Sequence, residues 1–219
     1  MRILALAVWF GAMAASGISQ TALQDDEDTQ SWNDLQLTVP VSKRFDFFTK
    51  FTLRVGKNIT RDTDNRIAVG SVWKPVKNLS ISPYYWYINA RNAAGRFRVE
   101  NRLSLAATYR YPFGKYAVSH RSTYEKRYRG IVNSWRYRTF FLVERDLPEK
   151  WIKKTKFFVA DEVFYDSLTQ RFSRNRFGFG ISKAINKQLT LDVYYTRQND
   201  GFSHPGDLNI IWTAWKVRL

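Results

Sequence analysis

Long segments in which apolar and polar residues alternate are the feature that most restricts the fold of this chain. In Arg44–Val55 and Phe97–Tyr111, apolar side chains alternate with polar or charged ones. Successive side chains of a strand point to opposite faces, so each segment has one apolar and one polar face. Strands of soluble proteins usually have about five or six residues, whereas a tilted strand needs about 9 to 11 to cross a membrane. The longer segments here predict membrane-spanning strands.

Eleven such segments follow one another, separated by clusters of Gly, Asn, Asp, Pro and Ser. They are Trp32–Val39, Arg44–Val55, Asn65–Trp73, Leu79–Asn89, Phe97–Tyr111, Lys115–Tyr128, Trp135–Arg145, Lys156–Tyr165, Arg174–Ser182, Gln188–Gln198 and Leu208–Leu219. This series predicts an all-β fold, a closed antiparallel transmembrane β-barrel of 10 to 12 strands. Because an alternating antiparallel sheet closes only with an even number of strands, we expect either a further strand in residues 20–31 or no strand at Trp32–Val39.

The connections between the segments alternate in length. Short ones lie at Pro40–Lys43, Lys74–Asn78, Pro112–Gly114 and Ala184–Lys187, with longer ones between them. Short periplasmic turns and longer external loops give this rhythm in outer-membrane barrels. Trp and Tyr crowd the segment ends, as expected for rings at the lipid headgroup level.

The N-terminus predicts export from the cytoplasm. One basic residue, Arg2, precedes a short apolar run, and small residues follow at Ala15, Gly17 and Ser19, which is typical of a cleaved signal peptide. We therefore expect a signal peptide over 1–19, an acidic N-terminal tail over 20–31 and a barrel over 32–219. The expected location is the outer membrane of a Gram-negative bacterium.

The net charge of +16 restricts the expected partners. Such an excess favours polyanions, and export argues against nucleic acid. Outer-membrane lipid, including the phosphorylated lipopolysaccharide, is the expected partner, and no cofactor is expected. The last segment alternates in apolar residues up to Leu219, which resembles the signal read by the barrel-assembly machinery, although that signal often has Phe at the end.

Several stretches carry a family resemblance. They are Ser31–Leu37, Arg98–Arg102, Trp135–Arg138, Asp161–Tyr165 and Asn175–Phe177. They resemble the domain of unknown function 2490 family, uncharacterised bacterial outer-membrane β-barrel proteins. The resemblance covers nearly all of the chain after the signal peptide. It implies a location and an architecture, and no activity.

The polar faces of the segments form the main candidate site. If the apolar faces meet lipid, the lumen is lined by Arg54, Arg98, Arg102, Arg110, Arg121, Arg127, Arg136, Arg138, Arg174 and Arg176, with Glu100, Glu125 and Glu144 as acidic partners. Desolvated arginines must pair with carboxylates or stay hydrated. The lumen is then either a salt-bridged filling or a narrow pore that favours anions, because basic rings stabilise negative ions. The sequence leaves both interpretations open.

Two alternative functions come from other features. His120 and Ser122 share a strand face and Asn133 follows in the next segment, an arrangement similar to the His, Ser and Asn of outer-membrane phospholipase A. A pair this short also arises by chance in an ordinary interfacial strand. A soluble secreted β-sandwich or lipocalin-like binding protein would show the same alternation with its apolar face inward. With two distant His and no Cys, no transition-metal site is expected.

Overall fold

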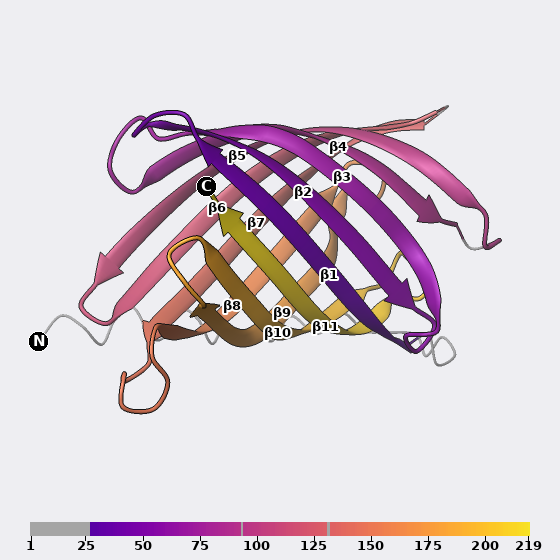
Figure 1. Ribbon diagram of the computed structural model, residues 1–219. Helices are drawn as coiled ribbons and strands as arrows, with labels where there is room; N and C mark the ends of the chain where they lie inside the picture. The colour runs from indigo at the N-terminus through magenta and orange to yellow at the C-terminus, as the bar shows by residue number, and fades with distance from the viewer. Residues whose placement is uncertain (1–26, 93, 131) are drawn as a thin grey trace, which may run out of the picture.

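The computed structural model describes residues 27–92, 94–130 and 132–219, which form a closed β-barrel of eleven strands (Figure 1). The strands are β1 (Glu27–Pro40), β2 (Phe45–Gly56), β3 (Arg61–Trp73), β4 (Leu79–Arg91), β5 (Phe97–Phe113), β6 (Tyr116–Arg129), β7 (Val132–Asp146), β8 (Thr155–Asp166), β9 (Arg171–Ala184), β10 (Leu189–Asp200) and β11 (Asp207–Arg218). All eleven expected segments are thus strands, and the predicted all-β barrel is confirmed. Within the described ranges, no helix has the length and apolar character to span a bilayer.

The N-terminal boundary differs from the expected one. The predicted signal peptide, 1–19, and residues 20–26 of the predicted tail lie outside the described residues. β1 begins at Glu27, so residues 27–31 of that tail belong to the barrel. Asp28 is buried and accepts hydrogen bonds from the backbone N–H groups of Lys57 (3.0 Å) and Asn58 (2.8 Å). This acidic residue therefore holds the turn between β2 and β3, where Lys57 and Asn58 have positive φ.

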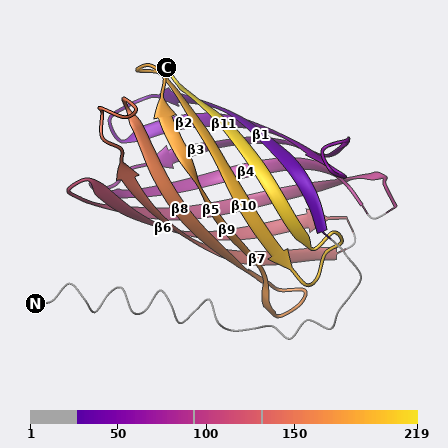
Figure 2. The same cartoon turned by 90° about the horizontal axis from the view of Figure 1, so that it is seen from below.

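A parallel seam between β1 and β11 closes the barrel. Each other neighbouring pair of strands is antiparallel, whereas Trp32 of β1 lies opposite Trp212 of β11 in a parallel ladder. Both views show β1 and β11 side by side (Figures 1 and 2). The expectation that only an even number of strands can close is therefore wrong. In an odd series the first and last strands run in the same direction, and here they pair as parallel strands.

The barrel has two rims, which we name after the ends of the chain. The N rim carries the start of β1 and the connections 57–60, 167–170 and 201–206. The C rim carries the connections 41–44, 74–78, 114–115, 147–154 and 185–188 and the terminal residue Leu219. The predicted rhythm of short and long connections is absent, because the strands extend into the expected long loops. The eight-residue connection 147–154 lies at the rim where only short turns were expected.

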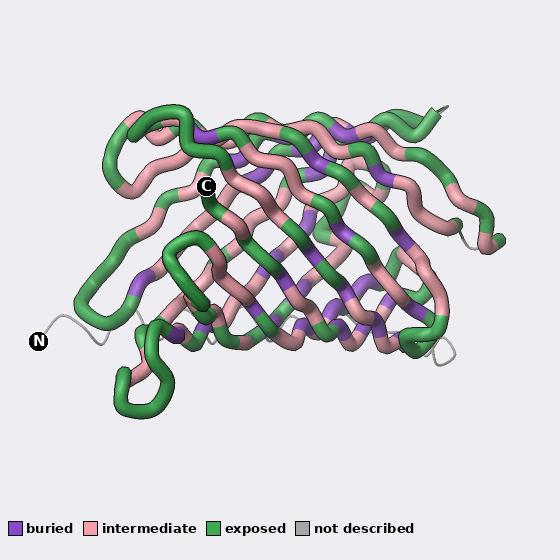
Figure 3. The backbone as a smooth tube through the Cα atoms, in the orientation of Figure 1, coloured by how far each residue is buried: buried purple, intermediate pink, exposed green. Residues whose placement is uncertain are grey.

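The pleat places apolar side chains on the outside and polar ones on the inside. On β5, Leu103 is 52% exposed, whereas Arg102 is 5% exposed. Buried and exposed residues alternate along the strands (Figure 3). The alternative of a soluble sandwich or lipocalin-like barrel is wrong, since it requires the apolar face to point inward.

Aromatic side chains fill one side of the interior. Trp212 stacks on Tyr194 with ring centres 5.0 Å apart and meets Trp32 edge-on at 4.7 Å. Tyr194 in turn contacts Phe158 of β8 at 5.5 Å. Gly180, opposite Tyr194, makes room for this ring, because a Cβ there would lie 2.2 Å from the Tyr194 Cβ. These rings pack part of the interior beside β8, β10 and β11.

Candidate functional site

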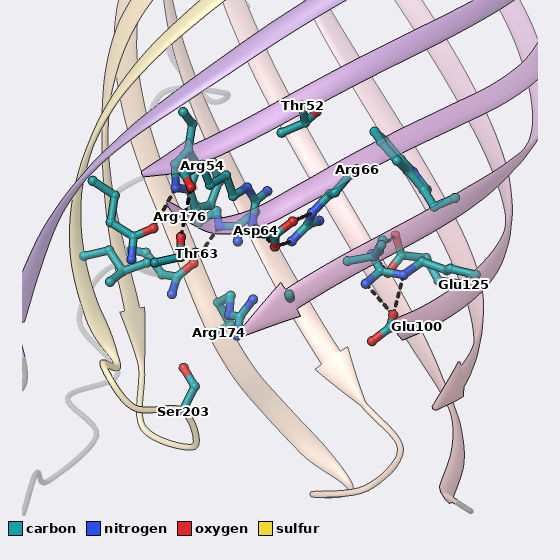
Figure 4. A pocket seen from close by; sticks show the side chains of 18 of the residues that line it. Thr52, Arg54, Thr63, Asp64, Arg66, Glu100, Glu125, Arg174, Arg176 and Ser203 are labelled. Atoms are coloured by element: carbon teal, nitrogen blue, oxygen red, sulfur yellow. Dashed lines mark hydrogen bonds and ion pairs between the residues drawn. The ribbon is translucent and has the colours of Figure 1, made fainter. Parts of the chain in front are cut away.

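A cavity of about 1720 Å³ occupies the barrel interior. It reaches the N rim at Lys57, Asn58 and Ser203 and extends along the lumen to Val72 and Ser82 near the C rim. Figure 4 shows side chains from several strands that line it. Fifteen Lys and Arg and seven Asp and Glu line this cavity, so its wall carries a large excess of positive charge.

Glu125 is the centre of the most buried ion-pair group. It points inward from β6, and its carboxylate lies 2.7 Å from Arg136, 3.2 Å from Arg102 and 3.3 Å from Arg138. Arg136 is its direct partner across the β6–β7 ladder, and the other two are diagonal neighbours on β7 and β5. Long side chains on one face of a sheet reach diagonal positions, so the pleat alone brings three arginines to one carboxylate.

Two further carboxylates are shared in the same way. Glu100 lies 2.5 Å from Arg102, 3.0 Å from Arg127 and 2.6 Å from Arg129. The second is Glu162, which lies 3.5 to 3.8 Å from its three partners. These partners are Arg138, Arg121 and Arg176. Each of these carboxylates thus faces several guanidinium groups, and pairing inside the protein neutralises only part of the positive charge.

Two buried aromatic rings hold further arginines at the cavity wall. The Arg54 guanidinium lies 3.4 Å from the centre of the Trp32 ring, and that of Arg176 lies 4.8 Å from it. Phe164 has four guanidinium groups around it at 4.9 to 5.6 Å from its ring centre: those of Arg136, Arg138, Arg174 and Arg176. A guanidinium over an aromatic face is attracted to the ring and keeps its N–H edge free for other partners.

The structure places most of the predicted lumen residues at this cavity. Nine of the ten predicted arginines line it, with Glu100 and Glu125. Arg110 and Glu144 do not; they pair with each other, and Glu144 also pairs with Lys156 at 2.8 Å. That these arginines bind anions stays a prediction.

Sequence reasoning missed several inward acidic residues. Asp34 pairs with Lys50 at 2.7 Å and accepts a hydrogen bond from the Trp212 indole at 2.8 Å. The other missed acids include Asp64, Glu162, Asp166 and Asp200, which pair with lumen arginines. Asp34 and Glu162 lie in predicted segments, where the alternation that identified the arginines also marks them as inward. Asp64, Asp166 and Asp200 were missed because they were expected in connections, whereas the strands extend to include them.

His120, Ser122 and Asn133 do not come together. His120 and Ser122 lie on the outer face of β6, where His120 Nε2 bonds Thr139 Oγ1 at 3.0 Å and Ser122 Oγ bonds the Tyr137 hydroxyl at 2.8 Å. Asn133 lies opposite Tyr128, eight residues along β6 from His120. At about 3.3 Å per residue this separation is roughly 25 Å. Asn133 therefore cannot orient the imidazole in this fold.

Asp161 and Glu162 are adjacent in β8, so their side chains point to opposite faces, and Asp161 lies on the outer one. It is half-buried and accepts a hydrogen bond from Asn175 on the neighbouring strand at 2.8 Å, whereas Glu162 points inward. The register between β8 and β9 shifts between Phe164 and Tyr165. Among the described residues, no three metal-ligating side chains form a group that could hold a metal ion.

The sequence and the fold can now be compared with known proteins. The family model described as "Protein of unknown function (DUF2490)" matches residues 29–209, which include ten of the strands in full or nearly so. The chain belongs to this family. This match confirms the family resemblance that the sequence analysis predicted. No curated protein matches the sequence.

A solved porin structure shares the barrel fold of this DUF2490 protein. The NanC porin has a TM-score of 0.54 and 9% identity, with 88% of this chain and 99% of that chain covered. An anion-selective porin from Comamonas acidovorans has a TM-score of 0.42 and 11% identity over 80% of this chain. This chain spans about half the length of the Comamonas porin, 54% of which is covered. At these identities the NanC similarity establishes the fold alone.

Proposed function

We propose that this protein is an outer-membrane channel with a narrow, arginine-lined lumen that favours anions. The observation that carries the proposal is the cavity of about 1720 Å³ whose wall has fifteen basic and seven acidic side chains. In a confined space of low dielectric constant, such an excess stabilises negative ions and repels positive ones. The apolar outer face and the length of the strands support a membrane location.

A structural barrel with a filled interior is the competing interpretation. The aromatic group around Tyr194 and Trp212 and the ion pairs of Glu100, Glu125 and Glu162 fill part of the lumen. The cavity nevertheless reaches from the N rim to Val72 and Ser82, which favours conduction. Contacts with lipopolysaccharide and with the barrel-assembly machinery remain predictions from the net charge and the last strand.

Planar-bilayer recording under a KCl gradient tests the proposal. We expect a small current whose reversal potential lies close to the equilibrium potential of chloride. In Arg138→Gln the preference for chloride should be weaker, because this change removes a positive charge from the lumen. Glu125 and Glu162 keep other arginine partners in this variant. Lys126→Gln is the matched control. Lys126 follows the inward Glu125 on β6, so its side chain is on the outer face and the same loss of charge occurs outside the lumen.

Two results would contradict the proposal. A cation-selective current would show that the excess of arginine does not control permeation. A folded protein that gives no current would favour the filled structural barrel. Membrane fractionation tests the location separately, because recovery in the soluble periplasm, without heat-modifiable gel mobility, would exclude an outer-membrane barrel.

A further inference from the structure

Five inward arginines gather on the cavity side of the two buried rings, Trp32 and Phe164. This arginine cluster consists of Arg54, Arg136, Arg138, Arg174 and Arg176. Arg176 joins its two halves, because its guanidinium lies 4.8 Å from the Trp32 ring centre and 4.9 Å from that of Phe164. All five side chains line the cavity, and Arg136 and Arg176 are more than nine-tenths buried.

The carboxylates near the arginine cluster are too few to neutralise it. Four of them lie within 4 Å of its members: Asp64, Glu125, Glu162 and Asp200. Three of the four also pair with arginines outside the cluster, namely Arg66, Arg102 and Arg121. Arg102 also pairs with Glu100, which brings Arg127, Arg129 and Asp166 into the same network. In this network ten guanidinium groups share six carboxylates, which leaves a local surplus of about four positive charges.

Some N–H groups of the arginine cluster also lack a charged hydrogen-bond acceptor. The Nε of Arg54 is buried and has no partner among the described atoms. Arg176 donates from Nε to the neutral amide oxygen of Gln198 at 2.8 Å, and its nearest carboxylate oxygen, on Glu162, is 3.8 Å away. Guanidinium groups present planar N–H edges, and these match the oxygens of carboxylates and phosphates.

A surplus of several buried charges within one short stretch of lumen is costly unless anions balance it. One anion that carries several charges balances it with a smaller loss of translational freedom than several monovalent ions. We propose that the arginine cluster is a binding site for an organic or inorganic anion with two or more oxyanionic groups. The cavity exceeds the usual volume of a small-molecule pocket, about 300 to 1,000 Å³, so space does not exclude such a ligand. This site rests on the proposed channel and identifies the class of anion that it would recognise.

Equilibrium titration of the folded, detergent-solubilised protein tests the site without requiring conduction. The probes are citrate, which carries carboxylates, pyrophosphate, which carries phosphates, and acetate as the monovalent control at matched ionic strength. We expect citrate or pyrophosphate to bind in the micromolar to millimolar range and acetate to bind at least tenfold more weakly. In Arg176→Gln the dissociation constant of citrate or pyrophosphate should rise about tenfold, because one hydrogen bond between charged groups is lost.

Arg218→Gln is the matched control for this substitution. Arg218 points inward at the C rim, pairs with Asp46 at 3.0 Å and does not line the cavity, so the same loss of charge should leave citrate affinity unchanged. Circular dichroism and heat-modifiable mobility confirm that both variants fold. Equal binding of citrate, pyrophosphate and acetate would overturn the site, as would equal effects of the two substitutions. Preference for one of the two multivalent probes would identify carboxylate or phosphate as the recognised group.

Bilayer recording separates failure of the site from failure of the channel. If both proposals hold, citrate or pyrophosphate should reduce the chloride current, and Arg176→Gln should raise the half-blocking concentration about tenfold. A chloride-selective current with no preferential block or binding would refute the site and leave the channel. Selective binding without any current would refute the channel and leave the site.

Discussion

Inward residues on neighbouring strands determine which ion pairs and ring contacts form in the lumen. Glu125 is fully buried, yet the carboxylate has three arginine partners because the pleat brings direct and diagonal neighbours to one side of the sheet. Arginine suits these positions better than lysine does, since its planar group can pair with a carboxylate and stack on a ring at once. Phe164 and Trp32 show this second contact.

Glu125→Gln should strongly destabilise the barrel. The substitution keeps the shape of the side chain but leaves Arg102, Arg136 and Arg138 without their shared charge. Breaking a buried ion pair costs about 3 to 5 kcal/mol, so we expect a loss of about 3 kcal/mol in the free energy of unfolding, measured by urea titration in vesicles. Glu149→Gln, in an exposed turn at the C rim, should change it by less than about 0.5 kcal/mol. Similar effects of both substitutions would mean that the Glu125 pairs contribute no stability.

At the same scale, the sequence predicted the arginines better than the acids. Period-two alternation identified residues such as Arg102 and Arg136, because long runs fix which face each residue occupies. Asp28 was assigned to the acidic N-terminal tail, yet it is buried against a turn. Arg176 was identified as a lumen residue, but its contacts with Trp32 and Phe164 join strands distant in sequence. No local pattern encodes such contacts.

Among the elements, the seam between β1 and β11 determines how the barrel closes. The strands themselves were predictable, since each has a long alternating pattern. Their ends were not, because residues such as Arg61 and Arg171, expected in loops, pair across the ladder with Gly56 and Asp166. The parallel seam depends on pairing between the first and last strands, and alternation within a strand does not determine its partner.

Cysteine cross-linking tests the register of this seam. The protein has no Cys, so Asn33→Cys with Thr213→Cys would introduce the only thiols. These positions face each other across β1 and β11, and mild oxidation should link them and change the gel mobility of the unfolded chain. Asn33→Cys with Val217→Cys is the control. Position 217 lies four residues beyond Thr213 on β11, about 13 Å from the position opposite Asn33 at 3.3 Å per residue. That exceeds the span of a disulfide. Linking of the control pair alone would contradict the register, and linking of neither pair would contradict the seam.

Across the whole molecule, the barrel reverses the usual distribution of polarity. Its outer surface carries exposed apolar residues such as Phe51 and Leu103, and its interior carries charged groups, aromatic packing and a large cavity. This arrangement explains how a chain with a net charge of +16 can present an apolar surface to lipid. Thirteen of the 21 arginines line the central cavity, where the proposed anion passage lies.

Spin labels on the two faces of β5 test this arrangement most directly. Leu103→Cys places a label on the outer face, and Thr108→Cys places one in the cavity. In reconstituted vesicles, we predict that the label at 103 relaxes with oxygen, which concentrates in lipid, and that the label at 108 relaxes with a water-soluble nickel chelate. If the label at 108 responded to oxygen and the label at 103 to the chelate, the lumen would not be the charged side of the sheet, and the account would be wrong.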